Sequence, residues 1–173
     1  AHCASQTVFG EGSETSKWMI VGEQPGDQED IQGRPFVGPA GKLLDQCLEH
    51  AGLSRQQLYI TNAVKHFRFE PRGKRRLHKT PSVGHIDACR WWLVQERKFV
   101  KPKNILAMGA TAARSILGHQ VSVNDARGRS HLQPDGSRVF VTVHPSYLLR
   151  LTDPDTRRSE TDRFIEDLKC FGE

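Results

Sequence analysis

The sequence predicts an α/β protein of three layers, α/β/α, in which helices cover both faces of a central, mainly parallel, four-stranded sheet. Four short apolar runs rich in β-branched residues have the length and composition of buried strands. The segments between these runs repeat apolar residues at the spacing of an α-helix. Strands that alternate with helices form parallel sheets covered on both faces, because each crossover helix packs on the sheet.

The expected elements follow in order along the chain. The strands are expected at residues 18–22, 58–61, 104–108 and 139–143. The helices are expected at residues 41–51, 83–99, 111–117 and 159–169. In the last helix, Phe164, Ile165 and Leu168 form one apolar stripe, which predicts the face that packs on the sheet.

Residues 67–81 have no apolar pattern. They are dense in charge and include Pro71, Gly73 and Pro81, so the sequence predicts a loop. A loop of this length exceeds a simple connection, which makes the segment a candidate for a functional role.

Length and composition predict one domain over residues 1–173. With 173 residues, 36% of them hydrophobic, the chain can build one compact core. No run approaches roughly 20 consecutive apolar residues and the start does not resemble a signal sequence, so we expect a soluble, intracellular protein without a membrane partner. Lys and Arg number 25 against 20 Asp and Glu, and this net charge of +5 favours a polyanionic partner without requiring one.

Polar residues follow each predicted strand. They form the runs GEQPGD at 22–27, NAVKH at 62–66, GAT at 109–111 and HPS at 144–146. In open parallel sheets, ligands bind beyond the carboxyl ends of the strands. The four runs are therefore expected to line a single pocket at one edge of the sheet.

The glycines at positions 22 and 26 fit either a turn whose amide groups point at a ligand or an ordinary turn. Nucleotide-binding fingerprints fit less well. A phosphate loop ending at residues 41–42 needs Gly where Phe36 stands, and no G-x-G-x-x-G run is present. Kinase-like and dinucleotide-binding functions are thus disfavoured.

Read together, GEQPG at 22–26 and HPS at 144–146 resemble the two motifs of the uracil-DNA glycosylase superfamily. GRPFVGPAG at 33–41 is similar to the segment after the first motif in the bacterial iron–sulfur branch, and YITNAVK at 59–65 is similar to the strand-two motif of that branch. Gln24 and the run KRRLH at 74–78 resemble the X-type enzymes, which crosslink themselves to the abasic product. Ordinary members of the branch, as the resemblance implies, lack this insert and release their product after attack by water.

The resemblance implies roles for three residues around the extruded base. Such an enzyme takes the base out of the stack, recognises its edge and expels it while positive charge develops on the sugar. The Asn62 amide can pair with uracil O4 and N3–H and reject cytosine, although an Asn that caps a loop is the alternative. Phe36 would stack on the ring, with core packing as its alternative. His144 would donate a hydrogen bond to uracil O2 as negative charge builds there.

Two further groups would act on the sugar and the DNA backbone. Glu23, Gln24 and Asp27 are placed to stabilise an oxocarbenium-like sugar, and which of them acts stays open. The segment with Ser146, Leu148 and Arg150 resembles the one that enters the minor groove, where an apolar wedge and a phosphate-binding Arg hold the base out.

The basic run would supply the crosslink. Lys74, Arg75 and Arg76 are expected to bind phosphates on either side of the extruded nucleotide and so bring His78 to C1′ of the deoxyribose. An oriented imidazole then outcompetes water, because proximity acts as a very high effective concentration.

The resemblance also implies a 4Fe-4S cluster. In this branch a C-x-x-C pair near the N-terminus, a residue just after strand two and a residue in the next helix bind the cluster. His66 and Cys89 stand at the third and fourth positions. The pair itself is expected just before Ala1, because the cysteines of this sequence form no C-x-x-C pair and Cys3 falls too late in the pattern.

The expected function is removal of uracil from DNA, with single-stranded DNA favoured as the partner and free uracil as the product. The protein is expected to be a monomer of the bacterial cytoplasm. Two alternatives stay open: an ordinary uracil-DNA glycosylase that turns over, in which His78 only contacts phosphate, and a non-catalytic module that senses uracil or abasic DNA.

Overall fold

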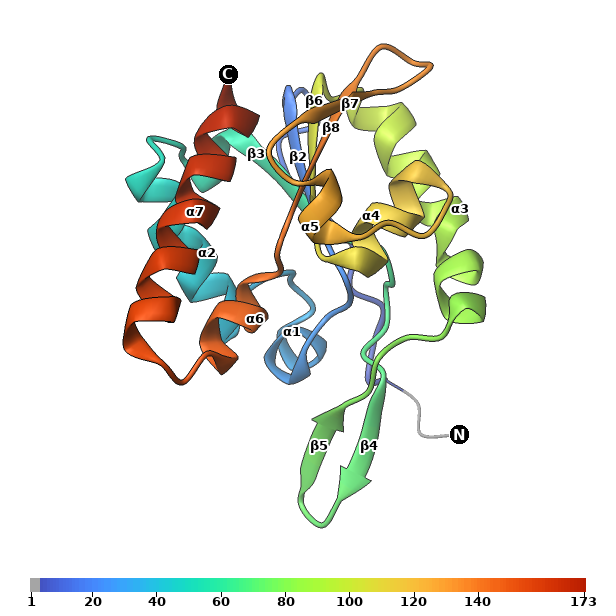
Figure 1. Cartoon of the computed structure of the whole chain (residues 1–173). Helices are drawn as coiled ribbons and strands as arrows, with labels where there is room; N and C mark the ends of the chain where they lie inside the picture. The colour runs from blue at the N-terminus through green and yellow to red at the C-terminus, as the bar shows by residue number, and fades with distance from the viewer. Residues whose placement is uncertain (1–3) are drawn as a thin grey trace.

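A computed structural model describes residues 4–173 as a six-stranded sheet with helices on both faces (Figure 1). The strand order is β1-β3-β2-β6-β8-β7. Its four inner strands are parallel: β3 (Leu58–Asn62), β2 (Trp18–Gly22), β6 (Asn104–Met108) and β8 (Arg138–Thr142). These are the four predicted strands, so the three-layer α/β fold is confirmed.

The prediction of only four strands in this sheet is wrong, because each edge carries a short antiparallel strand. β1 (Glu11–Gly12) pairs with β3, and β7 (Ser130–Leu132) pairs with β8. With two and three residues, both strands are too short to leave an apolar pattern in the sequence.

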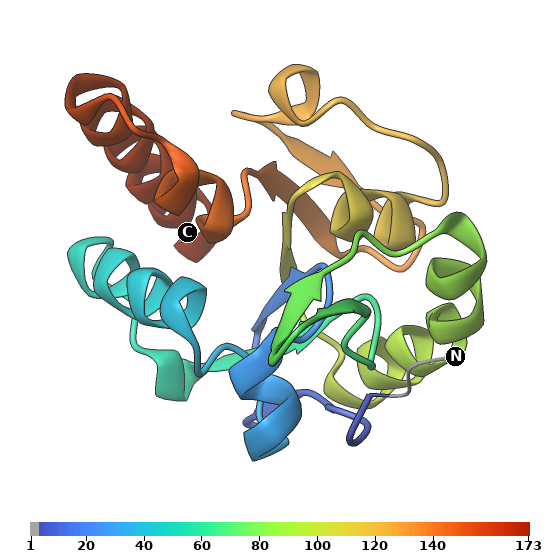
Figure 2. The same ribbon diagram turned by 90° about the horizontal axis from the view of Figure 1, so that it is seen from below.

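Helices pack against both faces of the sheet (Figures 1 and 2). The helices are α1 (Asp27–Gln32), α2 (Pro39–His50), α3 (Val83–Val100), α4 (Ala110–Leu117), α5 (Val123–Ala126), α6 (Pro145–Arg150) and α7 (Pro154–Gly172), with a 3₁₀ turn, η1 (Arg55–Gln57). The four predicted helices are α2, α3, α4 and α7. Both α2 and α7 begin earlier than predicted, at Pro39 and Pro154, where proline fits the first turn because its missing N–H has no partner there. Of the helices in the described part of the chain, none combines the length and apolarity needed to cross a membrane.

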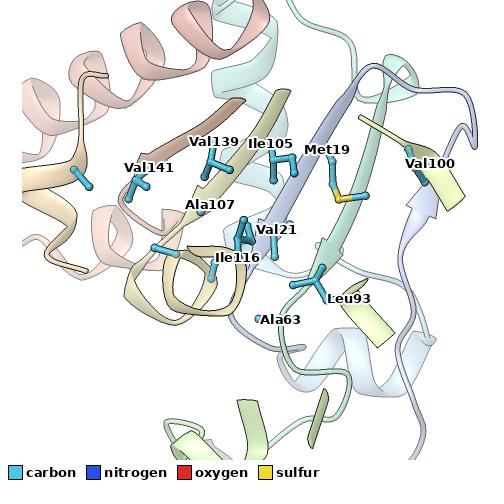
Figure 3. Packing of buried hydrophobic residues seen from close by; sticks show 13 residues of the cluster. Met19, Val21, Ala63, Leu93, Val100, Ile105, Ala107, Ile116, Val139 and Val141 are labelled. Atoms are coloured by element: carbon cyan, nitrogen blue, oxygen red, sulfur yellow. The ribbon is translucent and has the colours of Figure 1, made fainter. Parts of the chain in front are cut away.

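The alternation of side chains along β2 creates a core on each face of the sheet. Met19 and Val21 are fully buried on the α3 and α4 side, as Figure 3 shows, and Ile20 is fully buried on the α2 and α7 side. Full burial of each such side chain stabilises the fold by about 1.5–3 kcal/mol. Two dry cores therefore fix the sheet rigidly and hold the carboxyl ends of its parallel strands in place.

The predicted loop at 67–81 is instead largely a β-hairpin, so that prediction is wrong. Strand β4 (Phe69–Arg72) pairs antiparallel with β5 (Arg75–His78), and the ribbon projects from the end of the molecule at which β2 and β3 finish (Figure 1). Gly73 opens the two-residue turn with φ +62°, a conformation that favours glycine and matches the twist of a tight hairpin. The ribbon is exposed on both faces, so it has no apolar alternation to reveal it in the sequence.

Candidate active site

The four strand ends converge on one cavity of about 1120 Å³. Its lining includes Glu23 after β2, Asn62 at the end of β3, Gly109 after β6 and His144 after β8. This confirms the expectation that the four polar runs line a single pocket.

Asn62 lies at the base of this cavity with an unused acceptor. The residue is 2% exposed, and its Oδ1 atom has no hydrogen-bond partner within residues 4–173. A buried acceptor without a partner costs about 1–3 kcal/mol, which a ligand that donates to it would recover. Gly22 makes room for this arrangement, because a Cβ there would lie 2.5 Å from Asn62 Oδ1 and 2.4 Å from Phe36 Cζ.

Phe36 serves both the core and the cavity, so the two alternatives for this residue are compatible. It is 4% exposed within the α2 and α7 core, and it also lines the cavity. Its φ of +53° is unusual for an aromatic residue and stores strain. Arg55 stabilises the bend by donating from Nη1 to the Phe36 carbonyl at 2.8 Å, and Gly41 leaves space, since a Cβ there would lie 1.9 Å from that oxygen.

His144 is held as a neutral imidazole with one free donor. Its Nδ1 accepts from the Ser146 N–H at 3.2 Å and lies 2.8 Å from Ser146 Oγ. Burial lowers the pKa of His144 to about 4, and the nearby positive charge of Arg150 acts in the same direction. The remaining hydrogen is therefore on Nε2, which can donate to a ligand in the cavity.

The three residues proposed to stabilise the sugar have different partners. Glu23 Oε2 accepts from Thr111 Oγ1 at 2.7 Å, which orients the carboxylate, and its Oε1 lies 3.4 Å from His78 Nε2. Asp27 is already paired, because Arg76 Nε donates to its Oδ1 at 2.6 Å. Both carboxylates line the cavity, but Asp27 forms an ion pair with Arg76, whereas among the described residues Glu23 lies beside His78 and is paired with no Lys or Arg.

Gln24 fastens the base of the hairpin and orients His78. Its Oε1 accepts from the Arg68 N–H at 3.0 Å and its Nε2 donates to the Lys79 carbonyl at 3.0 Å, which fixes the direction of the amide. Nε2 must then also be the donor in its 2.7 Å contact with His78 Nε2. That ring nitrogen is thus unprotonated, with the hydrogen on Nδ1, and His78 lines the cavity with a side chain that is 51% exposed.

Arg76 anchors the hairpin rather than extending toward solvent, which corrects the expected phosphate contact. Its guanidinium bridges Asp27 Oδ1 at 2.6 Å and Asp30 Oδ2 at 2.5 Å, and it lies over the Phe67 and Phe69 rings with centroid distances of 5.3 and 5.1 Å. Although burial favours the neutral acid, hydrogen bonds that include the one from Arg76 hold the pKa of Asp30 below its ordinary value. Because the Arg76 guanidinium is occupied by two carboxylates and by the aromatic rings, it is not available to bind a DNA phosphate. Lys74 and Arg75 are exposed near the hairpin tip, outside the cavity lining.

Helix α6 carries three residues expected to contact DNA, and it buries one of them, Leu148, in the protein core. Ser146 lines the cavity as expected, and Arg150 lines it as well. Leu148 is 1% exposed and packs in the α2 and α7 core, so the prediction that it is an apolar wedge is corrected. The exposed apolar side chains of this helix are Tyr147 and Leu149, at 37% and 44%.

The expected cluster ligands do not form a metal site by themselves. His66 is exposed and its Nε2 lies 2.8 Å from Thr7 Oγ1, whereas Cys89 is buried beside Val64 and Ile86. Within residues 4–173, no three His, Cys, Asp or Glu side chains gather in a way that could hold a metal ion. Cys3 lies outside the described residues. The donors present therefore do not fit a cluster without ligands from elsewhere.

Sequence reasoning missed one wall of the cavity. Its lining continues to Val123 and Asn124 of α5 and to Glu160 and Arg163 of α7, which belong to no motif. The role of Thr111 was also missed, although the residue lies in a polar run at a strand end, which was the available signal.

Comparison with known proteins places this architecture in a family. A family model described as the uracil DNA glycosylase superfamily matches residues 9–169. A type-4 uracil-DNA glycosylase of Thermotoga maritima is 39% identical over 168 residues, which cover 96% of this chain and 83% of that protein. Others are the type-4 uracil-DNA glycosylases of Archaeoglobus fulgidus, 38% identical with 96% and 80% covered, and of Pyrobaculum aerophilum, 35% identical with 83% and 73% covered.

Proposed function

Because the chain belongs to the uracil DNA glycosylase superfamily, we propose that it excises uracil from DNA and then bonds to the abasic sugar through His78. The activity for which the type-4 relatives are named supports the excision. The position of His78 supports the covalent step. Its unprotonated Nε2 lies at the wall of the cavity that holds Asn62 and His144, 3.4 Å from Glu23.

Asn62 would select the base. Its unpartnered Oδ1 accepts from uracil N3–H and its amide donates to O4, whereas cytosine offers no hydrogen at N3. Phe36 flanks the same space, supported by Gly22, and provides a face on which the flipped ring stacks.

His144 and Glu23 would share the departure step. As the C1′–N1 bond breaks, its electron pair moves to uracil N1 and the negative charge spreads to O2, where the neutral His144 donates from Nε2. The positive charge that develops on the sugar lies nearest to Glu23, which Thr111 orients. Of the three residues left open, Glu23 is therefore assigned to the sugar, Gln24 to positioning His78, and Asp27 to anchoring Arg76.

His78 would then capture the sugar. Its Nε2 exchanges the hydrogen bond from Gln24 for a bond to C1′, and the imidazole gives up its Nδ1 proton. The departing uracil anion gains one proton, so the products are neutral uracil and a histidine–DNA bond, and no water is consumed. Hairpin β4–β5 holds the ring at the cavity, which makes the attack effectively intramolecular.

The preferred substrate would be single-stranded DNA, because flipping an unpaired base costs least. Lys74 and Arg75 at the exposed hairpin tip are placed to contact phosphates. The protein would act as a monomer.

A 4Fe-4S cluster is also part of the proposal, on the resemblance to the iron–sulfur branch. His66 and Cys89 would supply two ligands, and the other two would come from outside residues 4–173. Protein expressed from its full-length gene and purified without oxygen should contain about four irons per chain. Iron-free protein with full activity would contradict this assignment.

The experiment that tests the function counts free uracil against protein. With excess uracil-containing single-stranded DNA, the crosslinking enzyme releases about one uracil per protein molecule and stops. Continued release would favour the ordinary glycosylase, in which His78 only contacts phosphate. No release at all would favour a non-catalytic sensor and contradict the proposal.

A further inference from the structure

The cavity is larger than one extruded base requires. Its volume of about 1120 Å³ exceeds the roughly 300–1,000 Å³ of pockets that enclose whole small molecules. The space beyond Asn62 and His144 runs between α5 and α7. We call this part the α5–α7 arm and define it by Val123, Asn124, Glu160 and Arg163.

Arg163 is an unengaged cation in this arm. Its side chain is exposed, and no hydrogen bond or ion pair holds it within the part of the chain that the structure describes. Two other basic residues of α7 are engaged: Arg157 donates to the Leu151 carbonyl, and Lys169 pairs with Glu166 at 2.7 Å. Arg158 is exposed on the same helix but does not line the cavity. Arg163 is thus free to bind an anion that enters the cavity.

Glu160, the acidic residue of the arm, is already paired with a buried arginine. Glu160 Oε2 lies 3.1 Å from Nη1 of Arg127, whose side chain is only 1% exposed and also pairs with Asp167. Nη2 of Arg127 is buried without a hydrogen-bond partner among residues 4–173. The acids Asp162 and Glu166 of α7 line a different hollow, against α2. Arg163 is therefore the charged side chain of the arm that has no partner among residues 4–173.

We propose that the α5–α7 arm binds a phosphate of the DNA strand next to the flipped uridine, with Arg163 as its cationic contact. The inference rests on the proposed function, because the ligand is the backbone of the substrate strand. Arg150 lines the same cavity and donates to Ser146 Oγ beside His144 at 3.4 Å, so the cavity presents two arginines to a DNA strand. His78 of hairpin β4–β5 lines another part of the cavity. The DNA strand would therefore be bound on both sides of the extruded nucleotide.

The test compares Arg163→Ala with Arg158→Ala in single-turnover excision with protein in excess. Arg158 is the matched control, because it lies on the same helix, is exposed and does not line the cavity. Arg163→Ala should raise the half-saturating protein concentration and leave the maximal rate unchanged. Between 50 and 200 mM salt, the native protein should lose about two- to threefold more affinity than Arg163→Ala, as expected for one phosphate contact with a single strand. Arg158→Ala should match the native protein.

Oligonucleotides with one neutral methylphosphonate at a time locate the contact. At one position within a few nucleotides of uracil, the substitution should weaken binding by the native protein and have no further effect on Arg163→Ala. The inference is overturned if the native protein excises uracil but Arg163→Ala keeps the native affinity and salt dependence. It is also overturned if no methylphosphonate position weakens binding by the native protein while leaving Arg163→Ala unaffected. If the native protein releases no uracil, the proposed function itself fails.

Discussion

At the scale of single residues, the site depends on polar atoms held ready for a ligand. Asn62 Oδ1 is buried without a partner among the described residues, and Gly22 gives it room beside Phe36. Neutral His144 keeps its Nε2 hydrogen because Ser146 occupies Nδ1. The unsatisfied Asn62 acceptor costs stability in the free protein and becomes favourable when a base supplies the missing partner.

Asn62→Ala should remove the base contact. Each lost hydrogen bond to a buried group costs about 1–3 kcal/mol, so single-turnover uracil excision should slow about 10- to 100-fold. Thermal unfolding of the variant serves as the control and should stay within a few degrees of the native protein, because the native amide has an unsatisfied acceptor. Excision at the native rate would refute the role of Asn62 in recognition.

His144 should make stability depend on pH. Its folded-state pKa is about 4 and its ordinary value is 6.5, so in this window the unfolded chain binds a proton that the folded chain excludes. The free energy of unfolding is therefore highest above pH 6.5 and decreases as the pH falls toward 4. The decrease due to His144 reaches about 2 kcal/mol at pH 5. Urea unfolding at pH 7.5 and 5 should show a larger loss for the native protein than for His144→Gln. Equal losses in both proteins would contradict a depressed pKa.

The residues of the site differ in how far the sequence predicts them. Asn62 and His144 follow buried strands, and the geometry of a parallel sheet brings such positions together whatever lies between them. The hydrogen-bond partners of Gln24 lie 44 to 55 residues away in the sequence. Those of Arg76 lie 46 to 71 residues away. No local pattern encodes such distances, so the sequence alone could not assign their roles.

At the scale of elements, the β4–β5 hairpin carries the feature that separates this chain from an ordinary glycosylase in our proposal. Local sequence predicted its place but not its form. The Gly73-Lys74 turn was the available signal of a hairpin. The strands on either side of it were not recognised, because their charged residues show no apolar alternation. The buried strands were predicted well because their apolar runs are continuous.

Arg76→Ala should loosen this hairpin without touching the base site. Loss of the contacts to Asp27 and Asp30 should lower the rate of covalent capture about tenfold or more, since displacement of an attacking group by about 1 Å can cost 100-fold. The rate of uracil release should change much less. Arg75→Ala, at an exposed position, should instead weaken DNA binding and leave the ratio of capture to release unchanged. A ratio that stays at the native value in Arg76→Ala would show that the anchor does not position His78.

At the scale of the whole molecule, a buried ion pair ties the N-terminal segment, the sheet and α3 together behind the site. Lys65 is fully buried and donates to Thr61 Oγ1 at 2.7 Å, to the Asn62 carbonyl at 2.6 Å and to Glu96 Oε2 at 2.5 Å. Glu96 also accepts from the Gly10 N–H at 3.0 Å. All three hydrogens of the ammonium are used, which is the condition for a buried charge to be tolerated.

Removal of one partner should destabilise the fold more than removal of both. Lys65→Met leaves Glu96 without its cation and should lower the free energy of unfolding by about 3–5 kcal/mol. The double variant Lys65→Met/Glu96→Gln should recover part of this loss, because no uncompensated charge remains. Urea unfolding at pH 7 measures both values. A double variant less stable than the single variant would contradict this account of the pair.

The central claim is that His78 forms a covalent bond with the abasic sugar, and one gel tests it most directly. The protein is incubated with single-stranded DNA containing uracil, boiled in detergent and separated under denaturing conditions. We expect a shifted band for the native protein, its absence for His78→Ala, and fragment masses that place the adduct on His78. An undiminished shift with His78→Ala, or no shift with the native protein, would contradict the claim.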